Sequence, residues 1–229
     1  MSRIAIIPAR GGSKRIPRKN IRSFCGKPII QYSIEVALNS GLFDTVMVST
    51  DDTEIAQIAL DYGASVPFPR SESNSNDFAT TTDVLLEVIN HYEKLGQNYN
   101  QACCIYPTAP FLSASLLVNS LQLFTAEKYE TLFPVVAFDY PIQRSLSIND
   151  KGKVEMVWPE YLQSRSQDLT LRYHDSGMFY WFLPYILKQG KSLFTENSGS
   201  LIVSHLDCHD IDTIEDWEIA ELKFKRSKH

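Results

Sequence analysis

Short apolar runs rich in β-branched residues alternate with stretches of helical periodicity over the first 138 residues, and this alternation limits the possible folds more than any other feature. The strand-like runs occupy residues 4–7, 45–50, 102–106 and 131–138, and at least one stretch with helical spacing of its apolar residues separates each pair. Strand and helix alternate in this way when crossover helices join parallel strands. The pattern therefore predicts the α/β class, with a mostly parallel sheet and helices on both faces.

Several of the predicted helices have recognisable ends. Pro28 suits the first turn of a helix that Gly41 ends, because proline tolerates a first turn and glycine a left-handed backbone. Asp51 and Glu54 have the spacing of a capping box for the next helix, which stops at Gly63. For the later helices the expected caps are Thr81 or Thr82, Ser113 and Thr213.

Residues 139–175 break the alternation. A turn sequence at 150–153 separates two short strand-like runs, which predicts a small antiparallel hairpin. Strand-like runs then return at 177–183 and 201–205. With 229 residues in all, we expect one domain over 1–229 that carries 139–175 as an insertion.

The segment after the first predicted strand concentrates positive charge in an otherwise acidic chain. The formal net charge is -5. Five cations nevertheless fall within ten residues: Arg10, Lys14, Arg15, Arg18 and Lys19. Gly11 and Gly12 let the backbone approach a ligand, and Ser13 adds a hydroxyl donor. Such a turn suits a polyphosphate, although an ordinary solvated surface turn is the alternative.

Composition and motif spacing exclude several other classes of protein. A Walker A loop that began at Gly11 would need glycine where Ile16 stands, and the Rossmann pattern G-x-G-x-x-G is absent. The acidic charge argues against nucleic acid or a membrane surface as a partner. No apolar run approaches the roughly 20 residues of a membrane span. With no export signal and four cysteines at no zinc spacing, we expect thiols in a reducing cytoplasm.

Polar side chains are expected to converge at one edge of the sheet. Ligands of parallel α/β sheets bind outside the carboxyl ends of the strands. Arg10, Asp51 and Tyr106-Pro107 lie at the carboxyl ends of predicted strands, so we expect them at this edge. Residues 67–81 form a long polar loop, and a loop of that length inside a compact fold is usually functional or disordered.

Two carboxylates near the end of the chain predict a metal site. In an extended Asp210-Ile211-Asp212 segment, alternate residues share a face, so both carboxylates can point to one place while Ile211 packs inward. Two hard carboxylates beside a phosphate site suit Mg²⁺, which keeps several waters and binds substrate phosphates. The alternative is that one or both of them cap the last helix.

These motifs resemble a known family. The stretches 7–14, 17–20 and 26–28 resemble the opening of the nonulosonate cytidylyltransferases, the family of the CMP-sialic acid synthetases. The similarity continues in the same order over nearly the whole chain: Val48–Asp51, Arg70 with Asp77, Pro107–Pro110, Ser204–His205 and Asp210–Asp212. Within the family, 140–144 and 172–181 look most like the bacterial members that use pseudaminic acid.

The resemblance implies a fold, a reaction and a set of site residues. It implies a Rossmann-like homodimer, with 139–175 as the dimer contact, that joins CTP and a nonulosonic acid with Mg²⁺ as cofactor. The implied catalytic residues are Arg10, Lys14 and Lys19. The implied nucleotide-binding residues are Ala9, Arg10, Gly11, Gly12, Ser13, Lys14, Asn20, Arg70, Asp77, Ala79 and Thr81. The implied sugar-binding residues are Tyr106, Gln143, Arg144, Arg172, Tyr173 and His174, and the metal ligands are Asp210 and Asp212.

Two departures from the family pattern bear on the sugar. Sialic acid enzymes resemble this chain but carry Gln in place of Tyr106 and Asn-Gly in place of Ser176-Gly177. These departures weaken a sialic acid assignment and favour a different nine-carbon acid, and the resemblance at 140–144 and 172–181 makes pseudaminic acid the expected acceptor. N-acetylneuraminic acid, legionaminic acid and, more remotely, Kdo stay as alternatives, as does a non-catalytic nucleotide-binding protein. In the implied reaction the anomeric hydroxyl attacks the α-phosphorus of CTP, and no residue stands out as a general base.

Overall fold

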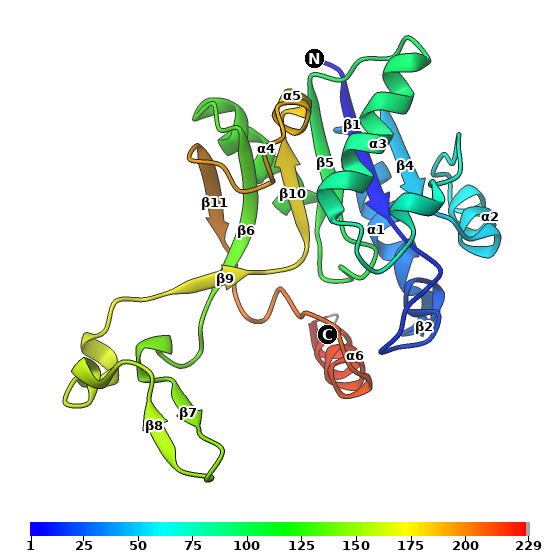
Figure 1. Ribbon diagram of the computed structural model, residues 1–229. Helices are drawn as coiled ribbons and strands as arrows, with labels where there is room; N and C mark the ends of the chain where they lie inside the picture. Colours follow the sequence, from blue (N-terminus) through cyan, green and yellow to red (C-terminus); the bar gives the residue numbers. More distant parts are fainter. Residues whose placement is uncertain (228–229) are drawn as a thin grey trace.

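A seven-stranded sheet forms the centre of the computed structural model, which describes residues 1–227 (Figure 1). Its strands are β1 (Arg3–Pro8), β4 (Thr45–Ser49), β5 (Gln101–Ile105), β6 (Thr131–Ala137), β9 (Tyr173–Asp175), β10 (Phe179–Phe182) and β11 (Ser198–Ile202). The strand order is β11-β6-β10-β5-β1-β4, and β9 also pairs with β6. The neighbours β5, β1 and β4 are parallel, as are β6 and β11. β10 lies antiparallel between β5 and β6.

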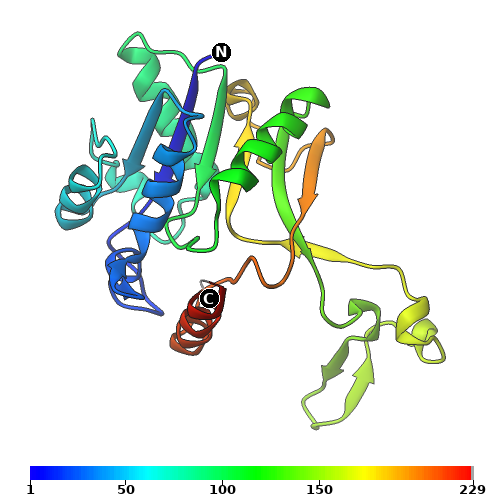
Figure 2. The same ribbon diagram turned by 180° about the vertical axis from the view of Figure 1, so that it is seen from behind.

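Helices cover both faces of this sheet, as the alternation predicts. The helices are α1 (Ile29–Asn39), α2 (Thr53–Asp61), α3 (Thr81–Lys94), α4 (Ala114–Ala126), α5 (Pro184–Lys188) and α6 (Ile214–Ser227). Successive strand residues point to opposite faces, so Ala5 and Ile7 pack with α1, α2 and α4, whereas Ile4 and Ile6 pack with α3 and α5. Figure 2 shows α1 and α4 on the face opposite α3. The predicted α/β class is confirmed.

A third apolar cluster joins the two ends of the chain. Trp217 and Phe224 of α6 pack with Ile16 and with Phe24, which belongs to the short hairpin of β2 (Ser23–Phe24) and β3 (Lys27–Pro28). Ile211 lies in the same cluster with 1% of its surface exposed. This packing holds the segment before α6 against the loop that follows β1.

Residues 138–172 leave the sheet and project from it (Figure 1). β7 (Leu146–Ile148) and β8 (Val154–Met156) form the expected antiparallel hairpin. The last residues of the predicted insertion, 173–175, return to the main sheet as β9. The hairpin therefore stands on two strands of the main sheet, β6 and β9.

The structure corrects three expected boundaries. Asp52, not Asp51, caps α2, because the Asp51 carboxylate accepts a hydrogen bond from the Gly11 N–H instead. Thr80, one residue before the expected cap, forms a capping box with Asp83 at the start of α3. β11 begins three residues earlier than the run at 201–205, because its position is set by pairing with β6. Within the described residues, the helices are too short or too polar to cross a membrane.

Candidate active site

A cavity of about 500 Å³ opens where β1 and β5 end. This volume is within the range of about 300–1,000 Å³ that is usual for small-molecule sites. Ten of the predicted site residues line it: Arg10, Ser13, Lys14, Lys19, Asn20, Arg70, Asp77, Ala79, Thr81 and Tyr106. Arg10, Tyr106 and the polar loop at 67–81 therefore converge as expected. Asp51, which we also expected at this edge, does not line the cavity and accepts a hydrogen bond from the Gly11 N–H instead.

The loop after β1 presents cations to the cavity. Arg10 Nη1 donates to Asp77 at 2.9 Å, and Lys14 forms an ion pair with the same carboxylate. These two cations, Lys14 first, hold the pKa of Asp77 below its ordinary value. Asn20 donates from Nδ2 to the carbonyl of Arg10 at 2.9 Å and so fixes the loop across its base. The arrangement shows that Arg10 and Lys14 can gather around a single anionic group.

The opposite wall comes from the polar loop at 67–81 and from the residues that follow β5. Arg70 is 8% exposed and donates to the Ser49 hydroxyl and carbonyl at 3.1 and 2.5 Å, and burial lowers its pKa. Burial also raises the pKa of Tyr106 to about 12, so this phenol stays neutral at neutral pH. The Tyr106 hydroxyl lies 3.5 Å from Thr81 Oγ1. This wall offers an aromatic ring, hydroxyl groups and a buried cation.

The segment 210–212 lies beside the cationic loop, as the metal prediction requires. Ile211 packs inward, and Asp212 Oδ1 accepts a hydrogen bond from Arg15 at 2.8 Å. Lys19 Nζ donates to the Ile211 carbonyl at 2.6 Å and lies 3.5 Å from Asp212 Oδ1. A cavity-lining lysine therefore connects the predicted phosphate site to the predicted metal site.

The capping alternative for the two aspartates is wrong. Thr213 Oγ1 accepts from the Asp216 N–H at 3.1 Å, and Asp216 accepts from the Thr213 N–H at 2.7 Å, so this pair caps α6. The side chain of Asp210 is exposed to solvent. Two carboxylates fit Mg²⁺, which prefers oxygen ligands and completes its shell with water and phosphate. Within residues 1–227, no three His, Cys, Asp or Glu side chains cluster as a metal site.

The predicted sugar-binding residues of the insertion do not line this cavity. Gln143 donates from Nε2 to the Thr170 carbonyl at 2.8 Å, and Arg144 donates to the Ser164 carbonyl at 3.0 Å. Both side chains therefore tie the hairpin to the returning chain. The other three residues lie at β9 with exposed side chains: Arg172, Tyr173 and His174. Their role in binding a sugar stays a prediction.

Three predicted nucleotide-binding residues do not line the cavity: Ala9, Gly11 and Gly12. Ala9 is buried at the end of β1, where its N–H donates to the Ser49 carbonyl at 2.9 Å. Gly12 has open space where a side chain would be, whereas Gly11 packs closely on Asp52. Glycine at 11 is therefore required by a close approach within the protein.

Sequence reasoning missed some residues of this site. Asn74, Asn76 and Thr108 also line the cavity, but single polar residues in loops carry no distinctive pattern. Asp175 lies at the end of β9, where burial and then the negative charge of Asp210 raise its pKa. Its Oδ1 accepts from the Gly177 N–H at 2.8 Å. Unlike the three loop residues, Asp175 was within reach of the sequence, because it belongs to the sugar-facing stretch predicted with Tyr173 and His174.

Comparisons with known proteins identify the family of the chain. A family model described as cytidylyltransferase matches residues 4–196. The chain is 44% identical to a pseudaminic acid cytidylyltransferase of Campylobacter jejuni, covering 98% of this chain and 97% of that protein. It is 30% identical to a CMP-N,N'-diacetyllegionaminic acid synthase of Legionella pneumophila, covering 95% and 94%.

A solved structure shares the fold. It is a CMP:2-keto-3-deoxy-manno-octonic acid synthetase complexed with CTP, with a TM-score of 0.73 and 19% sequence identity, covering 99% of this chain and all of that one. At this identity the likeness concerns the fold alone. The family model and the identity to relatives over nearly the full chain show more: this chain belongs to the cytidylyltransferase family of nucleotidyltransferases.

Proposed function

We propose that this protein transfers the cytidylyl group of CTP to pseudaminic acid and releases pyrophosphate. The observation that carries this proposal is the 44% identity, over 98% of the chain, to a pseudaminic acid cytidylyltransferase. The cavity supports it, because its lining includes the residues that the family resemblance assigns to the nucleotide.

The chemistry follows from the charges at the cavity. The anomeric oxygen of the acid forms a bond to the α-phosphorus of CTP, the bond to pyrophosphate breaks, and the hydroxyl proton is lost. Negative charge builds on the leaving pyrophosphate, and cations already in place stabilise it without reorganisation. The cavity-lining cations of the loop after β1 are Arg10, Lys14, Arg15 and Lys19. Positioning and neutralisation of charge are therefore the main contributions of the protein.

Mg²⁺ is part of this proposal. Asp210 and Asp212 would hold the ion, which when bound would neutralise charge on the CTP phosphates. Lys19 supports this assignment, because it contacts the carbonyl between the two aspartates and also lines the cavity.

We also propose that the protein works as a homodimer in the cytoplasm. The hairpin of β7 and β8 exposes large apolar side chains, including Leu146 at 61%, Ile148 at 73% and Val154 at 58%. An amphipathic hairpin of this kind needs a partner to cover it. All four cysteines lie in the described chain and none is in a disulfide, which is usual in a reducing compartment.

The test is a pyrophosphate-release assay with CTP, Mg²⁺ and a panel of acids: pseudaminic, N,N'-diacetyllegionaminic, N-acetylneuraminic and Kdo. We expect the highest kcat/KM for pseudaminic acid, with N-acetylneuraminic acid lower by roughly 10²-fold, because an apolar pocket rejects an added hydroxyl only moderately. Replacing CTP by UTP, ATP or GTP should remove the signal. A higher kcat/KM for another acid would reassign the acceptor, and no release with any acid would indicate a non-catalytic nucleotide-binding protein.

A further inference from the structure

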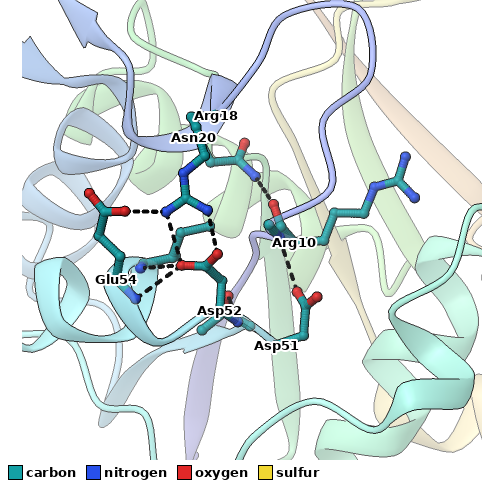
Figure 3. Close-up of polar contacts among 9 residues, drawn as sticks. Arg10, Arg18, Asn20, Asp51, Asp52 and Glu54 are labelled. Atoms are coloured by element: carbon teal, nitrogen blue, oxygen red, sulfur yellow. Dashed lines mark hydrogen bonds and ion pairs between the residues drawn. The ribbon is translucent and has the colours of Figure 1, made fainter.

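Arg18 differs from the other cations of its loop. Four of the five cations in residues 10–19, all of them within the described chain, line the cavity, whereas Arg18 does not. Figure 3 shows its guanidinium turned to the start of α2, beside Asp52 and Glu54, while the Arg10 side chain extends to the other side of the loop. The Arg18 side chain therefore contacts other protein side chains and does not line the cavity.

That partner is mainly Asp52. Arg18 Nη1 donates to Asp52 Oδ2, and Nη2 donates to Asp52 Oδ1 at 3.1 Å and to Glu54 Oε2 at 2.5 Å. A guanidinium that meets a carboxylate through two N–H groups is among the stronger and more directional protein contacts. The Asp52 side chain is 20% exposed and that of Glu54 66% exposed, so solvent screens the second contact more.

The same carboxylate also fixes the start of α2. Asp52 Oδ1 accepts the N–H groups of Glu54 and Ile55, each at 3.0 Å. The hydrogen bond from Arg18 holds the pKa of Asp52 below its ordinary value, so the carboxylate is charged at neutral pH. Asp52 therefore connects the start of α2 directly to the loop that lines the cavity.

The start of the loop, at Gly11, lies against Asp52 and its neighbour Asp51. The Gly11 N–H donates to Asp51 Oδ1 at 3.0 Å, and a Cβ added at Gly11 would lie 2.7 Å from Asp52 Oδ2. The Asp51–Asp52 pair therefore holds the loop at two points, at Gly11 near its start and at Arg18 near its end.

The backbone of Arg18 has an unusual conformation that surrounding contacts must stabilise. Its φ of 56° and ψ of 32° are left-handed, a conformation that residues with a side chain seldom adopt. Such a conformation persists where surrounding contacts hold it in place. Arg18 itself carries the side-chain contact to Asp52, so this contact can hold its backbone in the left-handed conformation.

We propose that Arg18 and Asp52 form a latch that positions the phosphate-binding loop, so that both are positioning residues for cytidylyl transfer. This inference rests on the proposed function. When the latch is broken, Arg10, Ser13 and Lys14 lose their alignment although none of them is changed. A displacement of about 1 Å in a positioning group can lower the rate by about 10²-fold.

Asp52→Asn is the decisive variant. Asparagine caps a helix about as well as aspartate, so the start of α2 is retained while the charge that holds Arg18 is removed. If Asp52 acted only through its electrostatic field, loss of a negative charge near a triphosphate site would tighten CTP binding. The latch predicts the opposite sign: weaker CTP binding, and kcat/KM for CTP lower by about tenfold to a hundredfold.

Three further variants and one control extend the test. Arg18→Met should match Asp52→Asn, and the double variant should be no worse than either single one, because the two residues act as one unit. Arg18→Lys keeps the charge without the planar fork, so it should recover only part of the activity. The matched control is Asp61→Asn, the same chemical change at the other end of α2, which should behave as the parent.

CTP affinity by calorimetry, pyrophosphate release and the melting temperature are measured on the full chain. The latch is supported if CTP affinity and kcat/KM fall while the melting temperature changes by only a few degrees. It is overturned if Asp52→Asn keeps or tightens CTP binding, or if activity is lost only because the variants unfold. A parent that binds CTP but turns over no acid overturns the proposed acceptor, and the latch is then decided by CTP affinity alone. A parent that binds no CTP overturns both proposals.

Discussion

Side chains at the cavity differ in how much they contribute to the stability of the fold. The Lys14 side chain is 75% exposed and forms an ion pair with Asp77, and an ion pair so open to solvent contributes little to stability. The Arg70 side chain is buried and bonded to the end of β4, so its loss would affect both properties. Exposed members of the site are therefore the better probes of function.

Lys14→Ala should lower kcat/KM for CTP by about 10²- to 10³-fold, because it removes a preorganised cation from the developing charge. The melting temperature should fall by no more than about 2–4 °C. Pyrophosphate release and thermal unfolding measure the two effects, with Lys94→Ala, an exposed lysine at the end of α3, as the control. A variant that keeps its activity but melts far below the parent would contradict the phosphate role of Lys14.

Asp212→Asn should raise the Mg²⁺ concentration needed for half-maximal activity and lower the maximal rate, while CTP still binds. The change removes the charge of a proposed ligand without opening a space, and the amide can still accept a hydrogen bond from Arg15. A Mg²⁺ titration of pyrophosphate release measures it. Asp207→Asn, an exposed residue of the same segment, is the control. Unchanged Mg²⁺ dependence in Asp212→Asn would remove it from the proposed metal site.

The elements were predictable where local pattern decides them. Strand-like runs and helical stripes placed β1, β4, β5, β6 and most helices, because burial of one face imposes its period on the sequence. Distant contacts decide the rest. Asp51 and Asp52 are equally good caps locally, and the choice depends on Gly11 and Arg18, which occupy them from another part of the chain.

In the candidate site, too, local sequence pattern predicts some features and distant contacts determine the others. The alternation at 210–212 predicted which residue packs inward. The contact between Arg15 and Asp212, 197 positions apart, needs the apolar cluster that holds α6 against the start of the chain. No local pattern encodes that contact. The roles of Gln143 and Arg144 in tying the hairpin were missed for the same reason, because their partners are backbone carbonyls about 20 residues or more away.

The start of α2 should make stability depend on pH. The pKa of Asp52 is lowered in the folded protein, first by the hydrogen bond from Arg18. Such a group contributes stability that is complete above its unfolded pKa of about 4 and is lost as the pH falls through the folded value. The parent should therefore melt above Asp52→Asn at pH 7, and the gap should close below about pH 4. Thermal unfolding at pH 7, 5, 4 and 3 measures this, and a gap that widens in acid would contradict the assignment.

At the scale of the whole molecule, the hairpin has one apolar and one polar face. The pairs Leu146 with Met156 and Ile148 with Val154 share a face, because alternate residues of paired strands do, and Ser147 lies on the other face. This apolar face projects from the sheet and is exposed in the single chain (Figure 1).

We expect the parent to be a dimer by light scattering, and Ile148→Lys to shift it to monomer by placing a charge in the apolar contact. Ser147→Lys adds the same charge on the opposite face of the same strand and should leave the dimer intact. Equal masses for the two variants, or a monomeric parent, would reject this face as the subunit contact.

Antiparallel β10 also determines when the sheet can be completed during synthesis. β5 and β6 are finished by residue 137, but the strand that fills the slot between them begins only at residue 179. At translation rates of about 5–20 residues per second, each nascent chain carries two unpaired strand edges for seconds. Apolar edges of this kind pair readily with other chains. A chain truncated before β10 would stay in that state, so such fragments should collect in the insoluble fraction of the cell.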